Sequence, residues 1–164
     1  MRAELVRAVD RLGVGAYLRR AQSLVDPNTR RARRDDEHLR LLLAFVLSSG
    51  SNCIDVGCHK GAVLSEMVHL APEGHHIAYE PLPHLAEKLR RAFPTVDVRN
   101  AALSDASGES TFVHVTTRPD YSGLRARPHP GAGRSEEIRV QMEDLDSHLP
   151  PGYVPTLIKI DVEG

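Results

Sequence analysis

Tryptophan is absent from this chain of 164 residues, and only four tyrosines and three phenylalanines supply aromatic rings. Proteins that bind single-stranded nucleic acid stack bases on aromatic side chains, and residues 1–50 offer only Tyr17 and Phe45 for this purpose. Basic charge is not in excess either, because 21 Lys and Arg face 22 Asp and Glu, which leaves a net charge of −1. We therefore expect no nucleic-acid partner.

Long apolar runs and cysteines are also scarce. The longest strongly apolar run, LLLAFVL, is far shorter than the roughly 20 residues that span a bilayer. The N-terminal stretch MRAELVRAVDRLG lacks the apolar core of a secretory signal. We expect no membrane partner and a cytoplasmic location. The two cysteines, Cys53 and Cys58, suit a reducing compartment, and without further well-spaced ligands they predict no metal site.

The first 50 residues read as a helical segment. Apolar residues recur at helical spacing over residues 3–25, and the sequence DPNT then breaks the pattern. The basic run RRARR that follows reads as an exposed hinge or helix end. We expect Asp35 or Asp36 to cap a second helix, which ends at Ser-Ser-Gly 48–50.

Residues 51–164 show alternating strands and helices instead. The first expected strands and helices are, in order, NCIDV, GAVLSEMVHLA, HIAYE, PHLAEKLRRAF and VDVRN. Parallel strands need crossover helices, so this order predicts an α/β fold with a doubly wound parallel sheet. STFVHV and EEIRVQM alternate apolar and polar residues, as half-exposed antiparallel strands do. The final PTLIKIDVEG reads as a buried strand that ends in acids.

The stretch IDVGCHKG ends the first expected strand with an acid and two glycines. A phosphate-binding P-loop would need Gly-Lys-Ser/Thr, which is absent. A dinucleotide fingerprint would need glycine where His59 stands, because a pyrophosphate must approach the backbone there. The spacing Asp-x-Gly-x-x-x-Gly fits Asp55, Gly57 and Gly61, and Glu80 then ends the second strand. A carboxylate at that position can accept both hydroxyls of a ribose.

Plainer interpretations stay open for several of these side chains. Asp55 could serve as a helix cap, and Glu80 as a solvent-facing strand end. Lys159, in an otherwise apolar strand, either snorkels to water or pairs with a neighbouring acid such as Asp55. Asp161 could act as a general base, bind a cofactor or hold the loop.

Five stretches, in this order and spacing, resemble the S-adenosylmethionine-dependent methyltransferases of the FkbM type: IDVGCHKG, YEPLPHLAEKLR, NAALSDASGESTFV, VQMEDLDSHLP and LIKIDVEG. The resemblance covers roughly residues 50–164. It implies a Rossmann-like, class I methyltransferase sheet and S-adenosyl-L-methionine as the cofactor. In the family pattern Asp55, Gly57 and Gly61 lie around the methionine part of the cofactor, and Glu80 lies on the ribose.

The resemblance assigns four further residues. It puts the backbone near Asn100 and Ala101 beside the adenine. Asp161 and Glu163 would lie at the end of the last strand, facing cofactor and acceptor, and are the candidate catalytic residues. The implied reaction is O-methyl transfer to a small-molecule acceptor, either a sugar or another small natural product. The loop over residues 116–135 is expected to face this acceptor.

Family members continue beyond the Glu-Gly pair with a helix and further strands, whereas this sequence ends there. We therefore expect residues 51–164 to form an incomplete sheet, a methyltransferase fragment that lacks its C-terminal strands. Its last strand would have an unpaired edge, which favours self-association. Two alternative functions stay open. One is a non-catalytic remnant that keeps the fold without useful ligand binding, and the other is a nicotinamide-dinucleotide-binding oxidoreductase domain.

Overall fold

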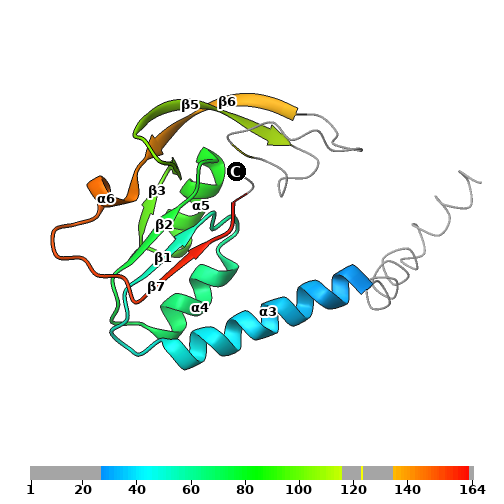
Figure 1. Ribbon diagram of the computed structural model, residues 1–164, viewed down its shortest axis with the longest axis vertical. Helices are drawn as coiled ribbons and strands as arrows, with labels where there is room; N and C mark the ends of the chain where they lie inside the picture. The colour runs from blue at the N-terminus through cyan, green and yellow to red at the C-terminus, as the bar shows by residue number, and fades with distance from the viewer. Residues whose placement is uncertain (1–26, 116–122, 124–134, 163–164) are drawn as a thin grey trace, which may run out of the picture. The chain divides into compact units, whose positions relative to one another are not determined.

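The computed structural model describes residues 27–115, 123 and 135–162 (Figure 1). The chain divides into two units, Met1–Leu42 and Leu43–Gly164, and each is described by itself. The helix expected over residues 3–25 lies outside the described residues. None of the described helices combines the length and the apolar character that a bilayer crossing needs.

Helix α3 spans Pro27–Val46. Proline suits the first position of a helix, because its φ is already helical and the missing N–H has no partner there. The expectation that Asp35 or Asp36 begins a helix is wrong, since both lie inside α3. The preceding run RRARR consists of arginine and alanine, which favour helix, and so the helix continues through it. In the last turn Leu43 is fully buried.

A parallel sheet of four strands is the centre of the second unit. Its strands are β1 (Cys53–Val56), β2 (His76–Tyr79), β3 (Asp97–Arg99) and β7 (Leu157–Ile160). They lie in the order β3-β2-β1-β7, which confirms the predicted parallel sheet and puts the last strand beside the first (Figure 1). All residues of β1 and β2 are buried, whereas β7 alternates half-buried and exposed positions.

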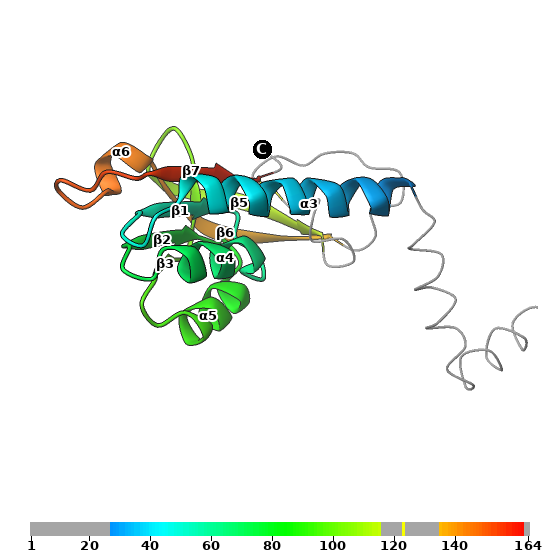
Figure 2. The same ribbon diagram turned by 90° about the horizontal axis from the view of Figure 1, so that it is seen from below.

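Two helices cover one face of this sheet (Figure 2). They are α4 (Ala62–Leu70) and α5 (Pro83–Ala92), both close to their predicted bounds. Leu64 of α4 and Leu89 of α5 pack in one apolar cluster with Val98 of β3. The opposite face carries a second cluster, in which Tyr79 of β2 packs near Leu145 of the short helix α6 (Leu145–His148).

A second sheet adjoins the first. It consists of β4 (Ala101–Leu103), β5 (Gly108–Val115) and β6 (Ser135–Glu143), in the order β4-β6-β5. The antiparallel pairing of β5 with β6 matches the prediction, whereas β4, parallel to β6, was not foreseen. The chain passes from β3 into β4 through Asn100. Phe112 and Val140 of this sheet pack against Leu85 of α5. Helix α5 therefore packs against both sheets.

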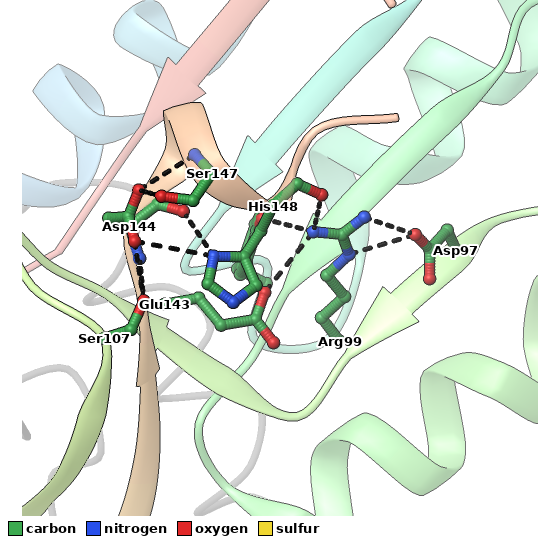
Figure 3. A network of polar contacts seen from close by, with 8 residues as sticks. Asp97, Arg99, Ser107, Glu143, Asp144, Ser147 and His148 are labelled. Atoms are coloured by element: carbon green, nitrogen blue, oxygen red, sulfur yellow. Dashed lines mark hydrogen bonds and ion pairs between the residues drawn. The ribbon is translucent and has the colours of Figure 1, made fainter. Parts of the chain in front are cut away.

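A polar network joins the end of β3 to the segment around α6 (Figure 3). Arg99 donates from Nη1 to the Tyr79 hydroxyl and to the His148 carbonyl, both at 2.8 Å. The same guanidinium pairs with Asp97 at 2.9 Å and with Glu143 at 3.3 Å. Arg99 therefore links two strands of the main sheet to the second sheet and to α6.

Candidate functional site

The carboxyl ends of the four parallel strands lie along one edge of the main sheet. In register, Tyr79 of β2 lies beside Val56 of β1 and Arg99 of β3, and Val56 lies beside Ile160 of β7. The residues that follow these strand ends are, in sheet order, Asn100, Glu80, Gly57 and Asp161. Sequence reasoning singled out all four, and the fold brings them to the edge where open α/β sheets bind ligands.

The loop between β1 and α4 turns sharply through residues with positive φ. These are Gly57 at 75°, His59 at 49° and Gly61 at 79°. A Cβ atom on Gly57 would collide with the Asp161 carbonyl oxygen, and one on Gly61 would lie 2.7 Å from Leu89 of α5. The glycine at 57 therefore lets the end of β7 approach the loop, and the glycine at 61 lets α4 pack against α5.

Asp55 is fully buried at the end of β1, with its Oδ1 atom 3.0 Å from Lys159 Nζ. Lys159 and the backbone N–H of Leu64 act on this carboxylate as donors, and no further hydrogen-bond partner of either oxygen is found among the described residues. Helix α4 begins after Gly61, and the backbone N–H of Leu64 in its first turn lowers the pKa of Asp55 as a hydrogen-bond donor, so the interpretation as a helix cap stays open. Burial raises the pKa of Asp55, and the Lys159 ammonium opposes this shift. A carboxylate can accept about four hydrogen bonds, so Asp55 keeps capacity for a ligand that brings a cation or a hydrogen-bond donor.

The Glu80 side chain turns back onto the backbone around it. Its Oε2 accepts the N–H of His59 at 2.8 Å, and its Oε1 accepts the N–H of Leu82 at 2.9 Å. Only 4% of the residue is exposed, so the interpretation as a solvent-facing strand end is wrong. Burial raises the pKa of Glu80, and the two N–H donors oppose the rise. Each carboxylate oxygen can accept about two hydrogen bonds, which leaves capacity for a pair of hydroxyl donors.

Asn100 lies at the corner between the two sheets. Its Nδ2 donates to the carbonyls of Glu80 and Pro81, both at 2.9 Å, and these bonds fix the exit of the chain from β2. Ala101 follows as the first residue of β4 and is 1% exposed. The fold therefore brings Asn100 to Glu80, whereas the Ala101 side chain belongs to the core.

Asp161 directly follows β7. Its N–H donates to the Val56 carbonyl at 3.1 Å, which extends the pairing with β1 by one residue. Its side chain is 81% exposed, with Oδ2 3.7 Å from Lys159 Nζ. An exposed carboxylate at a ligand edge is able to accept a proton. Glu163 lies outside the described residues, as does most of the expected acceptor loop over 116–135.

Two contributions to this site were not foreseen from the sequence. The backbone N–H of His59 binds Glu80, and the carbonyl of Gly57 lies 3.3 Å from Lys159 Nζ as an acceptor. Side-chain patterns carry no signal for a backbone donor or acceptor, because its direction depends on the path of the loop. The positive φ of His59 is uncommon for a residue other than glycine.

Among the residues that the structure describes, neither a reactive cysteine nor a metal site contributes to the candidate site. Cys53 and Cys58 are buried free thiols. Burial raises the pKa of Cys53 to about 11 and also raises that of Cys58, so both thiols stay protonated and unreactive at neutral pH. In the described part of the chain, no group of three His, Cys, Asp or Glu side chains is arranged to hold a metal ion.

Comparison with known proteins gives one match to a family. Residues 55–164 match the sequence profile described as "Methyltransferase FkbM domain". No curated protein matches the chain. Among the solved structures that match is the 23S rRNA methyltransferase ErmE, with 23% sequence identity and a TM-score of 0.34. That similarity covers 40% of this chain and only 28% of the ErmE chain.

Proposed function

The chain belongs to the methyltransferases with an FkbM domain, and on this premise we propose that it binds S-adenosyl-L-methionine at the carboxyl edge of its parallel sheet. The transferred methyl group would go to the hydroxyl of a small-molecule acceptor, a sugar or another small natural product. The family resemblance supports the cofactor and the class of acceptor.

The observation that supports this cofactor most strongly is the environment of the Glu80 carboxylate. This carboxylate is buried, it is held by the backbone N–H groups of His59 and Leu82, and it keeps acceptor capacity on both oxygens. That arrangement fits the two neighbouring hydroxyls of a ribose, because a carboxylate accepts and never donates when ionised. Asp55 supplies a second fit, since its buried carboxylate, paired with Lys159 through Oδ1, keeps acceptor capacity that suits the amino group of the cofactor's methionine part.

The adenine would lie beside Asn100 and the adjoining backbone of Ala101. Asn100 is fixed by two hydrogen bonds to the exit of β2, so the neighbouring backbone is held in place before a ligand binds. Gly57 and Gly61 would border the methionine part. Their positive φ values, which glycine adopts readily, give the loop the sharp turn that brings its backbone to this edge.

When bound, S-adenosylmethionine supplies a methyl group on a positively charged sulfur, which is already activated for transfer. The protein then has to align an acceptor oxygen and remove its proton. We assign proton removal to the Asp161 carboxylate, which is exposed just beyond β7 at the same edge as Glu80. Glu163, two residues further on, is the second candidate for this task.

The two alternative functions receive less support. A nicotinamide dinucleotide site would need glycine at position 59, where this chain has histidine, and the family match points to methyl transfer instead. A remnant without ligand binding leaves unexplained why the buried Glu80 carboxylate keeps spare acceptor capacity at the ligand edge of the sheet.

Isothermal titration of the folded chain with S-adenosylmethionine, S-adenosylhomocysteine and NAD tests the proposal. We expect heat of binding with the first two ligands and none with NAD. Heat with NAD alone would favour the oxidoreductase alternative, and no heat with any ligand would favour the remnant.

A further inference from the structure

Lys159 is a charged residue in a strand of apolar neighbours. Strand β7 has the sequence Leu-Ile-Lys-Ile, and the Lys159 side chain is only 14% exposed. A lysine that snorkels keeps its ammonium in water, whereas this side chain is mostly buried and its ammonium contacts protein oxygens. Burying an ammonium is costly unless opposite charges or hydrogen-bond acceptors compensate for the lost water.

Three oxygens from three different segments surround this ammonium. Lys159 Nζ lies 3.0 Å from Asp55 Oδ1, 3.3 Å from the Gly57 carbonyl oxygen and 3.7 Å from Asp161 Oδ2. The two nearer oxygens are within hydrogen-bond distance, whereas Asp161 is close enough only for an ion pair. The register explains the closest contact, because Lys159 and Asp55 are paired positions of the neighbouring strands β7 and β1.

The charge on Lys159 also offsets a concentration of acids. Glu80 at the end of β2 and Asp161 after β7 interact electrostatically with Asp55, and the thiol of Cys58 in the glycine loop stays protonated. Burial and the Asp161 charge raise the pKa of Asp55, while Lys159 lowers it. Without the lysine, burial and the Asp161 charge would raise the pKa of Asp55 further, which weakens its attraction for a cationic ligand.

We infer that Lys159 is a positioning residue of the cofactor site. It keeps the Asp55 carboxylate ionised and holds it through Oδ1, so that the carboxylate keeps acceptor capacity for the amino group of the ligand. Through the Gly57 carbonyl it also fixes the glycine loop before the ligand binds. This role rests on the proposed function, and the family match does not assign it.

Three variants test this role. Lys159→Met removes the charge at similar length, and Lys159→Arg keeps it. The double variant Asp55→Asn with Lys159→Met removes the unpaired buried charge, so that a folded sample is available even if Lys159→Met alone unfolds. Lys88→Met is the matched control, because Lys88 is an exposed lysine on α5, away from the strand ends.

The binding readout is titration with S-adenosylhomocysteine between pH 6 and pH 9. In Lys159→Met the pKa of Asp55 rises further, so affinity should fall at least tenfold at pH 7 and recover as the pH rises and Asp55 ionises. Lys159→Arg should restore most of the affinity, and Lys88→Met should behave as the wild-type chain. The double variant should bind weakly without that pH dependence, because it has no carboxylate at position 55.

The ligand-free readout is hydrogen exchange of the Gly57 and Cys58 amides, both of which donate to the Tyr79 carbonyl. We expect faster exchange in Lys159→Met and no change in Lys88→Met. Unchanged exchange together with wild-type affinity across the pH range would overturn the inference and leave the proposed function intact. Absence of binding by the wild-type chain itself would instead overturn the proposed function and the cofactor role of Lys159 with it.

Discussion

The Glu80 carboxylate at the end of β2 accepts the backbone N–H of His59 in the loop after β1, at 2.8 Å. One buried side chain therefore connects the ends of two neighbouring strands at the candidate site. A ligand that binds Glu80 would also stabilise the glycine loop, because the loop conformation and the carboxylate orientation depend on the same hydrogen bond.

Replacement of Glu80 by alanine should weaken the binding of S-adenosylhomocysteine by about 1.5–3 kcal/mol, the range for hydrogen bonds to a charged group. Glu80→Gln should weaken binding less than Glu80→Ala, because the amide side chain keeps one acceptor oxygen. Titration calorimetry on samples shown to be folded by circular dichroism measures the loss. The control is Glu73→Ala, since Glu73 is exposed just before the start of β2. Wild-type affinity in Glu80→Ala would exclude Glu80 from the ribose role.

Gly57→Ala should destabilise the fold more than Gly152→Ala. Both glycines have a φ near 75°, so both variants lose about 1–2 kcal/mol to backbone strain. A Cβ atom at Gly152 has open space, whereas one at Gly57 meets the Asp161 carbonyl, and such overpacking costs roughly 1–3 kcal/mol more. Urea denaturation of the two variants gives both free energies of unfolding. Equal losses would show that Asp161 does not approach Gly57 as closely as described.

Asp144→Ala should lower stability at neutral pH and have less effect in acid. Asp144 caps α6 by accepting the Ser147 N–H at 2.9 Å and also accepts the Ser107 hydroxyl at 2.6 Å (Figure 3). These hydrogen bonds lower the pKa of Asp144 in the folded state. The stability that its charge contributes is therefore fully present above the ordinary pKa near 3.8 and is lost progressively as the pH falls from there through the lowered value, so that part of it is already lost at pH 3.

Urea midpoints at pH 7, 5 and 3 measure this difference between the wild type and Asp144→Ala. Asp146→Ala is the control, because Asp146 is an exposed acid in the same helix. A difference that stays constant down to pH 3 would show that the charge of Asp144 does not contribute to the cap.

The outer side of β7 should promote self-association. Ile158 is 40% exposed and Ile160 is 62% exposed, and β7 has β1 as its only strand neighbour in the described part of the chain. A second copy of the chain could pair with this edge. Ile158→Lys should weaken the association, because an edge-to-edge pair of two copies brings the two lysines near each other, and like charges there cost about 1 kcal/mol.

Sedimentation velocity over a range of concentrations measures this self-association. Val154→Lys, in the exposed segment before β7, provides a change of the same kind outside the strand. A wild-type chain that remains monomeric at every concentration would contradict the prediction. Equal self-association of the two lysine variants would contradict it as well.

The strands and helices of the main sheet were predictable because each has its own local signal. Pro72 and Gly74 end α4, Pro83 begins α5, and short apolar runs mark the strands. Strand β4 has no such signal, since Ala101–Leu103 is three residues long and forms by pairing with β6. The start of α3 was misplaced because the acids at 35–36 resemble a cap, although Pro27 is the better sign of a helix start.

The site was predictable in its residue types and less so in its contacts. The order of the motifs predicted that Asp55, Gly57 and Glu80 lie at one edge of the sheet, because parallel strands align their carboxyl ends. The two backbone donors to Glu80 and the choice of partner for Lys159 depend on the path of the loop and on strand register. The pairing of Lys159 with Asp55 was one of two open interpretations, and the 3.0 Å contact confirms it.

A nuclear magnetic resonance titration of the ¹⁵N-labelled chain with S-adenosylhomocysteine tests the central claim most directly. We predict that the amide signals of Gly57, His59, Glu80 and Asn100 shift together and saturate with one ligand per chain. The signal of Gly74, which precedes the opposite end of β2, should not move. Shifts confined to other parts of the chain, or no shifts at a large excess of ligand, would contradict the assignment of this edge as the cofactor site.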